Sequence, residues 1–104
     1  MHLAVRGEDM KTVFKYELPM GDEVRVKMPA FARVLSVGVQ YEHLFVWALV
    51  DKDVPELHKT FRIAGTGHPI EDVDKWNFIG TVQMASGQLI FHIFELDPKR
   101  ELPN

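Results

Sequence analysis

The chain has 104 residues, of which 46% are hydrophobic and 26% charged, a composition that indicates one globular domain and excludes a disordered or collagen-like chain. Its 12 Lys and Arg residues are outnumbered by 15 Asp and Glu residues, so the formal net charge of -3 offers no overall positive field for nucleic-acid phosphates. With no cysteine, the chain has no disulfide framework, thiol nucleophile or iron–sulfur ligand. We predict no cofactor, and nucleic acid is an unlikely partner.

The two ends of the chain are expected to lie outside the folded domain. Residues 1–9 have no extended apolar stretch of the kind found in an export signal, and they are predicted to be an N-terminal extension. Residues 97–104 have little to bury and are predicted to be a flexible tail. The longest apolar run, residues 44–50, is far shorter than the roughly 20 residues of a membrane-spanning helix, so no membrane partner is expected.

Between these ends, hydrophobic and polar residues alternate in short runs, and a period of two predicts β-strands. The first two runs, residues 12–18 and 23–28, are separated by turn residues at 19–22. A β-hairpin is the simplest prediction for them.

The third and fourth runs, residues 33–41 and 44–50, are expected to be joined by a tight turn at Glu42-His43. A fifth strand, residues 58–65, precedes a long connection that ends at Lys75 and in which Pro69 could open one helical turn. The last two strands are predicted at residues 78–84 and 88–96. Together the runs indicate an all-β single domain over residues 10–96, an antiparallel β-sandwich or small barrel of about seven strands.

Two of these strands are apolar on both faces, which a two-layer sandwich does not require. In residues 44–50 and 89–94, hydrophobic side chains occupy almost every position. The second face must therefore be covered by the loops at 51–56 and 65–75, by barrel closure or by another subunit. We predict a homo-oligomer, most simply a dimer.

The most unusual local chemistry lies in the segment Gly65-Thr66-Gly67-His68-Pro69. Two glycines allow successive backbone N–H groups to point inward, and such a nest favours anions. Arg62 precedes the segment, and Trp76 follows it as an exposed ring for stacking, whereas Trp47 is expected in the core. The predicted ligand-binding residues are Arg62, Gly65, Thr66, Gly67, His68 and Trp76. The alternative is that this glycine-rich segment is a purely structural turn.

Other chemical motifs are missing from the chain. The histidines show no H-x-x-x-H or H-E-x-x-H spacing, so we predict no metal site, and His92 is expected to be a hydrogen-bonded residue of the core or of an interface and not a general base. Ser36 and Ser86 do not lie in a G-x-S-x-G elbow, and the carboxylates of residues 71–74 are interpreted as a solvated loop cluster. We predict no catalytic residue.

Five segments carry a resemblance to a known group of proteins: KTVFKYEL (11–18), WALVD (47–51), GTGHP (65–69), FIGT (78–81) and FHIFE (91–95). In this order they resemble a family of small, largely uncharacterised proteins encoded by tailed bacteriophages and prophages. The resemblance implies a non-enzymatic accessory binding protein in the cytoplasm of the bacterial host. Such a protein could inhibit host defence by binding a host protein or by sequestering an anionic, nucleotide-like small molecule. The alternatives are a small hydrolase or nucleotide-cleaving enzyme that uses His68, and a virion or assembly component.

Overall fold

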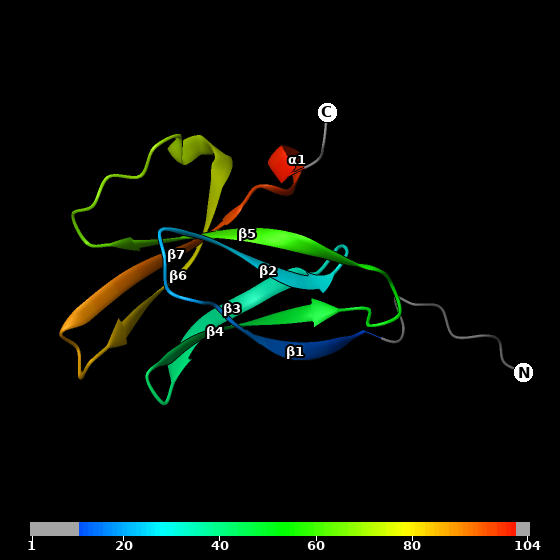
Figure 1. Cartoon of the computed structure of the whole chain (residues 1–104), viewed down its shortest axis with the longest axis horizontal. Coiled ribbons are helices and arrows are strands. Elements are labelled where there is room, and N and C mark those ends of the chain that lie inside the picture. The colour runs from blue at the N-terminus through cyan, green and yellow to red at the C-terminus, as the bar shows by residue number, and fades with distance from the viewer. Residues whose placement is uncertain (1–10, 102–104) are drawn as a thin grey trace, which may run out of the picture.

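The computed structural model describes residues 11–101 and contains two antiparallel β-sheets (Figure 1). The strands are β1 (Thr12–Glu17), β2 (Glu23–Pro29), β3 (Arg33–Gln40), β4 (His43–Val50), β5 (Glu56–Gly65), β6 (Trp76–Met84) and β7 (Leu89–Leu96). The first sheet has the order β1-β4-β3, and the second has the order β2-β5-β7-β6. The two sheets form a sandwich and do not close into a barrel. The all-β prediction is confirmed, with the sandwich as the form adopted.

The core lies between the two sheets and follows directly from the alternation in the sequence. On β4, four side chains spaced two residues apart are buried, and their neighbours on the opposite face are only partly buried. Phe61 at the centre of β5 is completely buried and packs in the same cluster. The remaining buried members are Leu18, Val24, Met28, Leu44, Val46, Ala48, Val50, Ile63, Val82 and Ile93.

The predicted hairpin between the first two strands is wrong, because β1 and β2 belong to different sheets. β1 pairs with β4, and β2 pairs with β5. The link between them is fixed at both ends by backbone hydrogen bonds, from the Leu18 N–H to the Leu44 carbonyl and from the Ile63 N–H to the Asp22 carbonyl. A period of two shows which face of a strand is buried, but it does not specify the partner strand.

The turn between β3 and β4 lies one residue earlier than predicted. Its two residues are Tyr41 and Glu42, with φ angles of 52° and 63°, and His43 is already the first residue of β4. Positive φ at both positions defines the two-residue hairpin turn that matches the twist of paired strands. This geometry usually selects Gly or Asn, and neither is present here.

The connection from β5 to β6 must cross β7. Both strands are antiparallel to β7 and therefore run in the same direction, one on each side of it. β5 ends with Gly65 opposite Phe91, and β6 begins with Trp76 opposite Leu96, so the chain travels back along β7 by about 16 Å. We call residues 66–75 the crossover connection. In Figure 1 it arches away from the end of β5 and returns to the start of β6.

The crossover connection covers part of the second apolar face of β7, one of the two strands that are apolar on both faces. It lies on the outer face of the second sheet, where the outward side chains of β7, including His92, Phe94 and Leu96, are only partly exposed. On the outer face of β4, the Lys15 ammonium lies 4.5 Å from the centre of the Phe45 ring and hydrogen-bonds the Gln40 side chain. The chain thus covers part of each outer face itself, and self-association remains a prediction.

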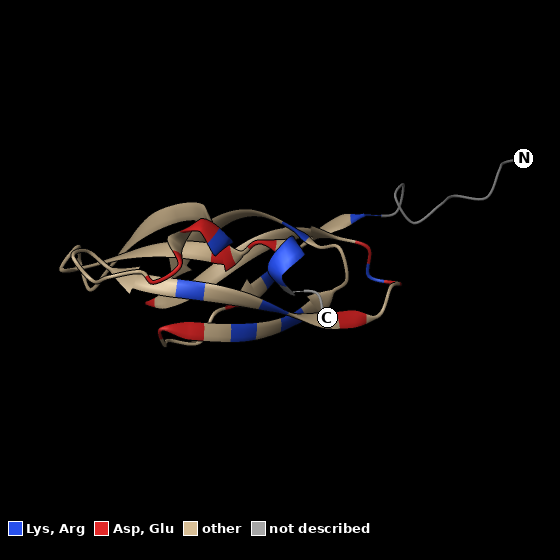
Figure 2. Cartoon of the chain, turned by 90° about the horizontal axis from the view of Figure 1, so that it is seen from above, with Lys and Arg blue, Asp and Glu red and all other residues tan. Residues whose placement is uncertain are grey.

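Two short helical segments complete the described chain. A 3-10 turn, η2 (Val73–Lys75), begins four residues after the predicted helical turn at Pro69, and α1 (Pro98–Glu101) is a single turn in the predicted tail. Residues 1–10, which include the predicted N-terminal extension 1–9, and residues 102–104 lie outside the described residues. Within residues 11–101, no helix is long and apolar enough to span a membrane. Figure 2 shows acidic and basic positions interspersed along the strands and loops of this part of the chain.

The core predicts a large difference between two phenylalanine truncations. Phe61→Ala should lower the free energy of unfolding by about 3–5 kcal/mol, because it opens a cavity at a fully buried position. Phe78→Ala should cost about 1 kcal/mol or less, since this largely exposed ring keeps an edge-on contact with Phe94. Urea unfolding measures both values, and equal losses would contradict this description of the core.

Tyr16 predicts a specific pH dependence of stability. Burial raises the pKa of its hydroxyl above the ordinary value of 10.0, and the charge of Glu56 in the other sheet raises it further. Below pH 10 the hydroxyl is neutral in both states; above it the unfolded chain loses this proton first, so stability falls as the pH rises. Unfolding at pH 8 and pH 11 should show a smaller fall for Tyr16→Phe than for the native chain. Identical falls would remove Tyr16 as a cause.

Candidate functional site

The glycine-rich segment forms a tight turn at the end of β5. The His68 N–H donates to the Gly65 carbonyl at 3.1 Å, and Gly67 has a φ of 88°, which glycine adopts without strain. A Cβ atom on Gly65 would lie 3.1 Å from the His68 ring, so this glycine allows the imidazole to approach the backbone. The shape of the turn thus explains both glycines, and the His68 N–H forms a hydrogen bond within the turn.

Arg62 holds the crossover connection against the sheet. It lies between the buried residues Phe61 and Ile63 and therefore points to the outer face. Its guanidinium donates to the carbonyls of Asp22 (3.2 Å), Ile63 (2.8 Å) and Pro69 (3.0 Å), which belong to three different parts of the chain. A carboxylate oxygen of Asp22 lies 3.7 Å away. Part of the donor capacity of Arg62 that was predicted to bind an anion is thus used by the protein's own backbone.

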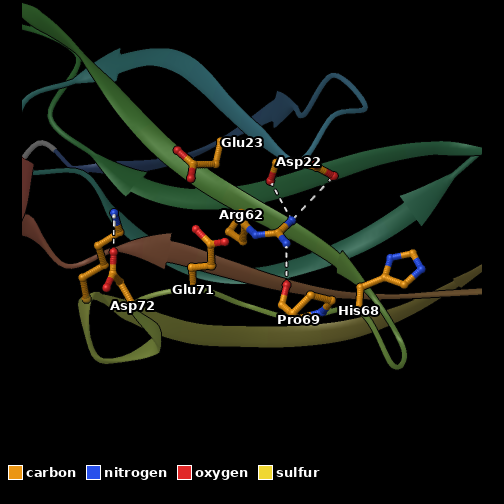
Figure 3. A pocket seen from close by; sticks show the side chains of 8 residues that line it. Asp22, Glu23, Arg62, His68, Pro69, Glu71 and Asp72 are labelled. Carbon is orange, nitrogen blue, oxygen red and sulfur yellow. Dashed lines mark hydrogen bonds and ion pairs between the residues drawn. The ribbon is translucent and has the colours of Figure 1, made fainter.

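Arg62 and His68 do lie together in a hollow of about 430 Å³ between the second sheet and the crossover connection, which we call the crossover pocket (Figure 3). Its lining residues are Asp22, Glu23, Arg62, His68, Pro69, Glu71, Asp72 and Lys75. Four of them are carboxylates, against two permanent cations. This charge balance disfavours an anionic ligand at this place.

Thr66 makes its contact elsewhere, with a histidine on β7. Its hydroxyl lies 2.7 Å from Nε2 of His92, and the Thr81 hydroxyl lies 2.9 Å from Nδ1 of the same ring. In a neutral imidazole one ring nitrogen donates and the other accepts, so the two hydroxyls can satisfy both. The structure therefore gives His92 the partners expected of a structural histidine.

The environments of the two tryptophans differ from those predicted, which were an exposed Trp76 and a core Trp47. Trp76 is only 7% exposed, because it lies where the crossover connection rejoins the sheet, and the prediction of an exposed stacking ring is wrong. Trp47 points outward from β4 and is only partly buried. Its ring packs over Gly38, where a Cβ atom would come within 3.1 Å of it. The alternation of hydrophobic and polar residues along a strand does not show which of its faces is covered by another segment of the chain.

The feature that the sequence analysis missed is the turn between β2 and β3. The Ala32 N–H donates to the Pro29 carbonyl at 3.2 Å, which closes a turn whose third residue is Phe31. Phe31 has a φ of 65° and is 97% exposed. Glycine is the residue that usually occupies such a position, so a link of Ala-Phe-Ala without glycine was the available signal.

Beside this turn lies a second hollow, of about 610 Å³, which we call the Phe31 pocket. Its apolar part is contributed by Met28, Ala32, Leu57 and Pro98, among others. Its polar lining residues are Arg25, His58 and Lys59. It is larger and more apolar than the crossover pocket, and within the described residues no carboxylate lines it.

Neither pocket contains an arrangement that points to a metal. Within residues 11–101, no group of three or more His, Asp or Glu side chains is placed to hold an ion. The carboxylates of the crossover pocket therefore contribute negative charge and form no recognisable metal-binding group within residues 11–101.

The comparisons with known proteins identify the family without a function. The sequence profile of a family described as a domain of unknown function (DUF7352) matches residues 10–103, and the chain belongs to this family. No curated protein and no solved structure matches the chain.

The position of Arg62 predicts a structural effect for its loss. Arg62→Met keeps the aliphatic chain but removes the guanidinium hydrogen bonds to three backbone carbonyls, of which that of Asp22 keeps the Ile63 N–H as a donor. We therefore expect the free energy of unfolding to fall by about 2 kcal/mol. Limited proteolysis should also cut faster within residues 66–75. The control His68→Gln changes an exposed ring and should stay within about 0.5 kcal/mol of the native chain. An Arg62→Met protein as stable as the control would show that the connection does not depend on this clamp.

Proposed function

We propose that this member of the DUF7352 family is a non-enzymatic binding protein that captures a segment of a partner protein at the Phe31 pocket. The single observation that carries the proposal is the place of Phe31, an aromatic side chain that is 97% exposed and lines a largely apolar hollow of about 610 Å³. Its backbone has a φ of 65°. Left-handed backbone costs an L-residue about 1–2 kcal/mol. Such outliers persist at binding sites, where the strain has a use.

The surroundings of Phe31 support a protein partner. Leu57 beside it is 61% exposed although it lies on the same face of β5 as the buried Phe61. Two exposed hydrophobic side chains next to an apolar hollow resemble the centre of a protein interface, where aromatic anchors contribute most of the binding energy. The hollow of about 610 Å³ can accept one or two side chains of a partner.

The same exposure argues against a small-molecule ligand as the main occupant. Small-molecule pockets enclose most of the surface of their ligand. Phe31 stands almost entirely in solvent, so it cannot form the wall of an enclosed cavity. Sequestration of a nucleotide-like ligand is for this reason the weaker form of the binding hypothesis.

The biological setting of the proposal rests on the sequence resemblance to proteins of tailed bacteriophages and prophages. In that setting the protein would act in the cytoplasm of the bacterial host, as an inhibitor of host defence that binds a host protein. Comparing phage growth in bacteria that express the native chain or Phe31→Gly tests this role. Equal phage growth in both strains would contradict it.

Two glycine variants separate binding from backbone strain. Phe31→Gly and Tyr41→Gly each remove an exposed aromatic residue from a positive-φ position, at φ angles of 65° and 52°. Each should raise the free energy of unfolding by about 0.5–1 kcal/mol, since glycine relieves the strain but also loosens the unfolded chain. Peptides selected from a random display library on the native chain should bind Tyr41→Gly normally and fail to bind Phe31→Gly.

Tyr41 is the matched control because it lies in a hairpin turn and does not line the Phe31 pocket. If the selected peptides bind both variants equally well, or if no peptide is enriched, the Phe31 pocket is not a docking site and the proposal fails.

A further inference from the structure

The charges that line the Phe31 pocket indicate the chemistry of its partner. Its charged or titratable lining residues are Arg25, His58 and Lys59, and no carboxylate of the described chain joins them. This contrasts with the chain as a whole, which has a net charge of -3, and with the crossover pocket, where four carboxylates gather. The local excess of cations is therefore not a consequence of composition.

The basic residues of the lining differ in whether they are free to pair with a partner's carboxylate. The Lys59 ammonium lies 3.1 Å from a carboxylate oxygen of Glu95, and both side chains are largely buried, so this charge is already paired. Arg25 and His58 are exposed on neighbouring strands, where Arg25 is opposite Thr60 and His58 is opposite Lys27. Within the described residues, Arg25 has no carboxylate partner. Its guanidinium is free to bind a carboxylate with two parallel hydrogen bonds.

Two further basic residues follow a lining residue in the sequence. Pro98, which lines the pocket, begins the short helix α1, and the next two residues are the exposed cations Lys99 and Arg100. Two acidic residues lie next to the lining residues but outside the lining: Glu56, the first residue of β5, is opposite Pro29, and Asp97 precedes Pro98. A partner approaching Phe31 therefore meets an apolar hollow whose lining carries cations and no carboxylate of the described chain.

We propose that the partner segment is acidic, with a hydrophobic side chain that enters the Phe31 pocket and an Asp or Glu residue beside it that pairs with Arg25. This inference rests on the proposed function of the pocket and adds the chemical class of the partner. Hydrophobic burial would supply affinity, while the charge pair would select acidic segments and reject basic ones.

An anionic membrane is the other partner that an apolar surface with cations could suit. Recognition of acidic lipid surfaces usually involves clusters of four to eight Lys and Arg residues on one surface. Here the pocket lining offers one unpaired permanent cation, Arg25, and the apolar residues line a hollow instead of forming a continuous insertion surface. These features favour a single side chain of a protein partner over a lipid bilayer.

The test is selection of random peptides on the full chain, followed by analysis of their composition. The enriched peptides should carry a hydrophobic residue flanked by Asp or Glu, and their binding should fall in high salt. Arg25→Glu should weaken binding roughly ten- to a hundredfold, the loss expected for a charge-assisted hydrogen bond. Lys52→Glu is the matched control, because it changes the net charge equally at an exposed residue outside the pocket lining. Arg25→Gln, with urea unfolding of each variant, separates lost contacts from lost folding.

The outcomes distinguish this inference from the function on which it rests. Peptides that depend on Phe31 but show no acidic residues, or bind Arg25→Glu as well as the native chain, overturn the inference and leave the docking function in place. Peptides that bind without Phe31 overturn both. Phe31-dependent binding to phosphatidylserine vesicles would identify a membrane as the partner, and a Phe31-dependent dimer in sedimentation would identify a second copy; either result contradicts the acidic-segment proposal.

Discussion

The passage of the chain from β5 to β6 is the constraint on which most of the second sheet depends. Because β7 lies between these two parallel strands, the connection has to cross it on one face of the sheet. Arg62 fixes this crossing through backbone carbonyls of the β1–β2 link, of β5 and of the connection itself. The crossing brings Thr66 against His92 on the outer face of β7 and ends at Trp76, which is buried. Part of the second apolar face of β7 is thereby covered by the chain itself.

The same constraint explains why the glycine-rich segment is poorly suited to binding an anion. Three hydrogen bonds to backbone carbonyls hold the Arg62 guanidinium in place and use part of its five-donor capacity. The remaining groups around it are predominantly carboxylates. The opposite situation holds at the β2–β3 turn, where an aromatic side chain is exposed, the backbone is strained and Arg25 is unpaired within the described chain. Structural roles and binding potential are thus separated along the same pair of strands, β2 and β5.

The sequence predicted the strands well and their arrangement poorly, for a physical reason. Alternation depends on neighbouring residues, and it located β3, β4 and β7 to within one residue at each end. Pairing depends on contacts between distant segments, so the hairpin of the first two strands was wrong. The candidate site was affected in the same way. The residue types around Gly65 were correct for anion binding, but only the fold shows that Arg62 donates to the protein's own backbone and that Trp76 is buried.

The sequence around Phe31 contains a local feature of the β2–β3 turn, the absence of glycine. A three-residue link of Ala-Phe-Ala between two strands contains no glycine, although its geometry places the middle residue at positive φ. An aromatic residue in such a link is unfavourable both for the backbone and for solvation. The absence of glycine is visible in the sequence, whereas the positive φ that makes this absence unusual is shown only by the structure.

The central claim is that binding occurs at the β2–β3 turn and not at the glycine-rich segment. It is tested most directly by nuclear magnetic resonance of the ¹⁵N-labelled full chain, titrated with a peptide from the selection. The account predicts that backbone amide shifts concentrate at residues 30–32 and 57–59 and leave residues 65–72 unchanged. Shifts concentrated at residues 65–72 would contradict it and return the binding site to the crossover connection.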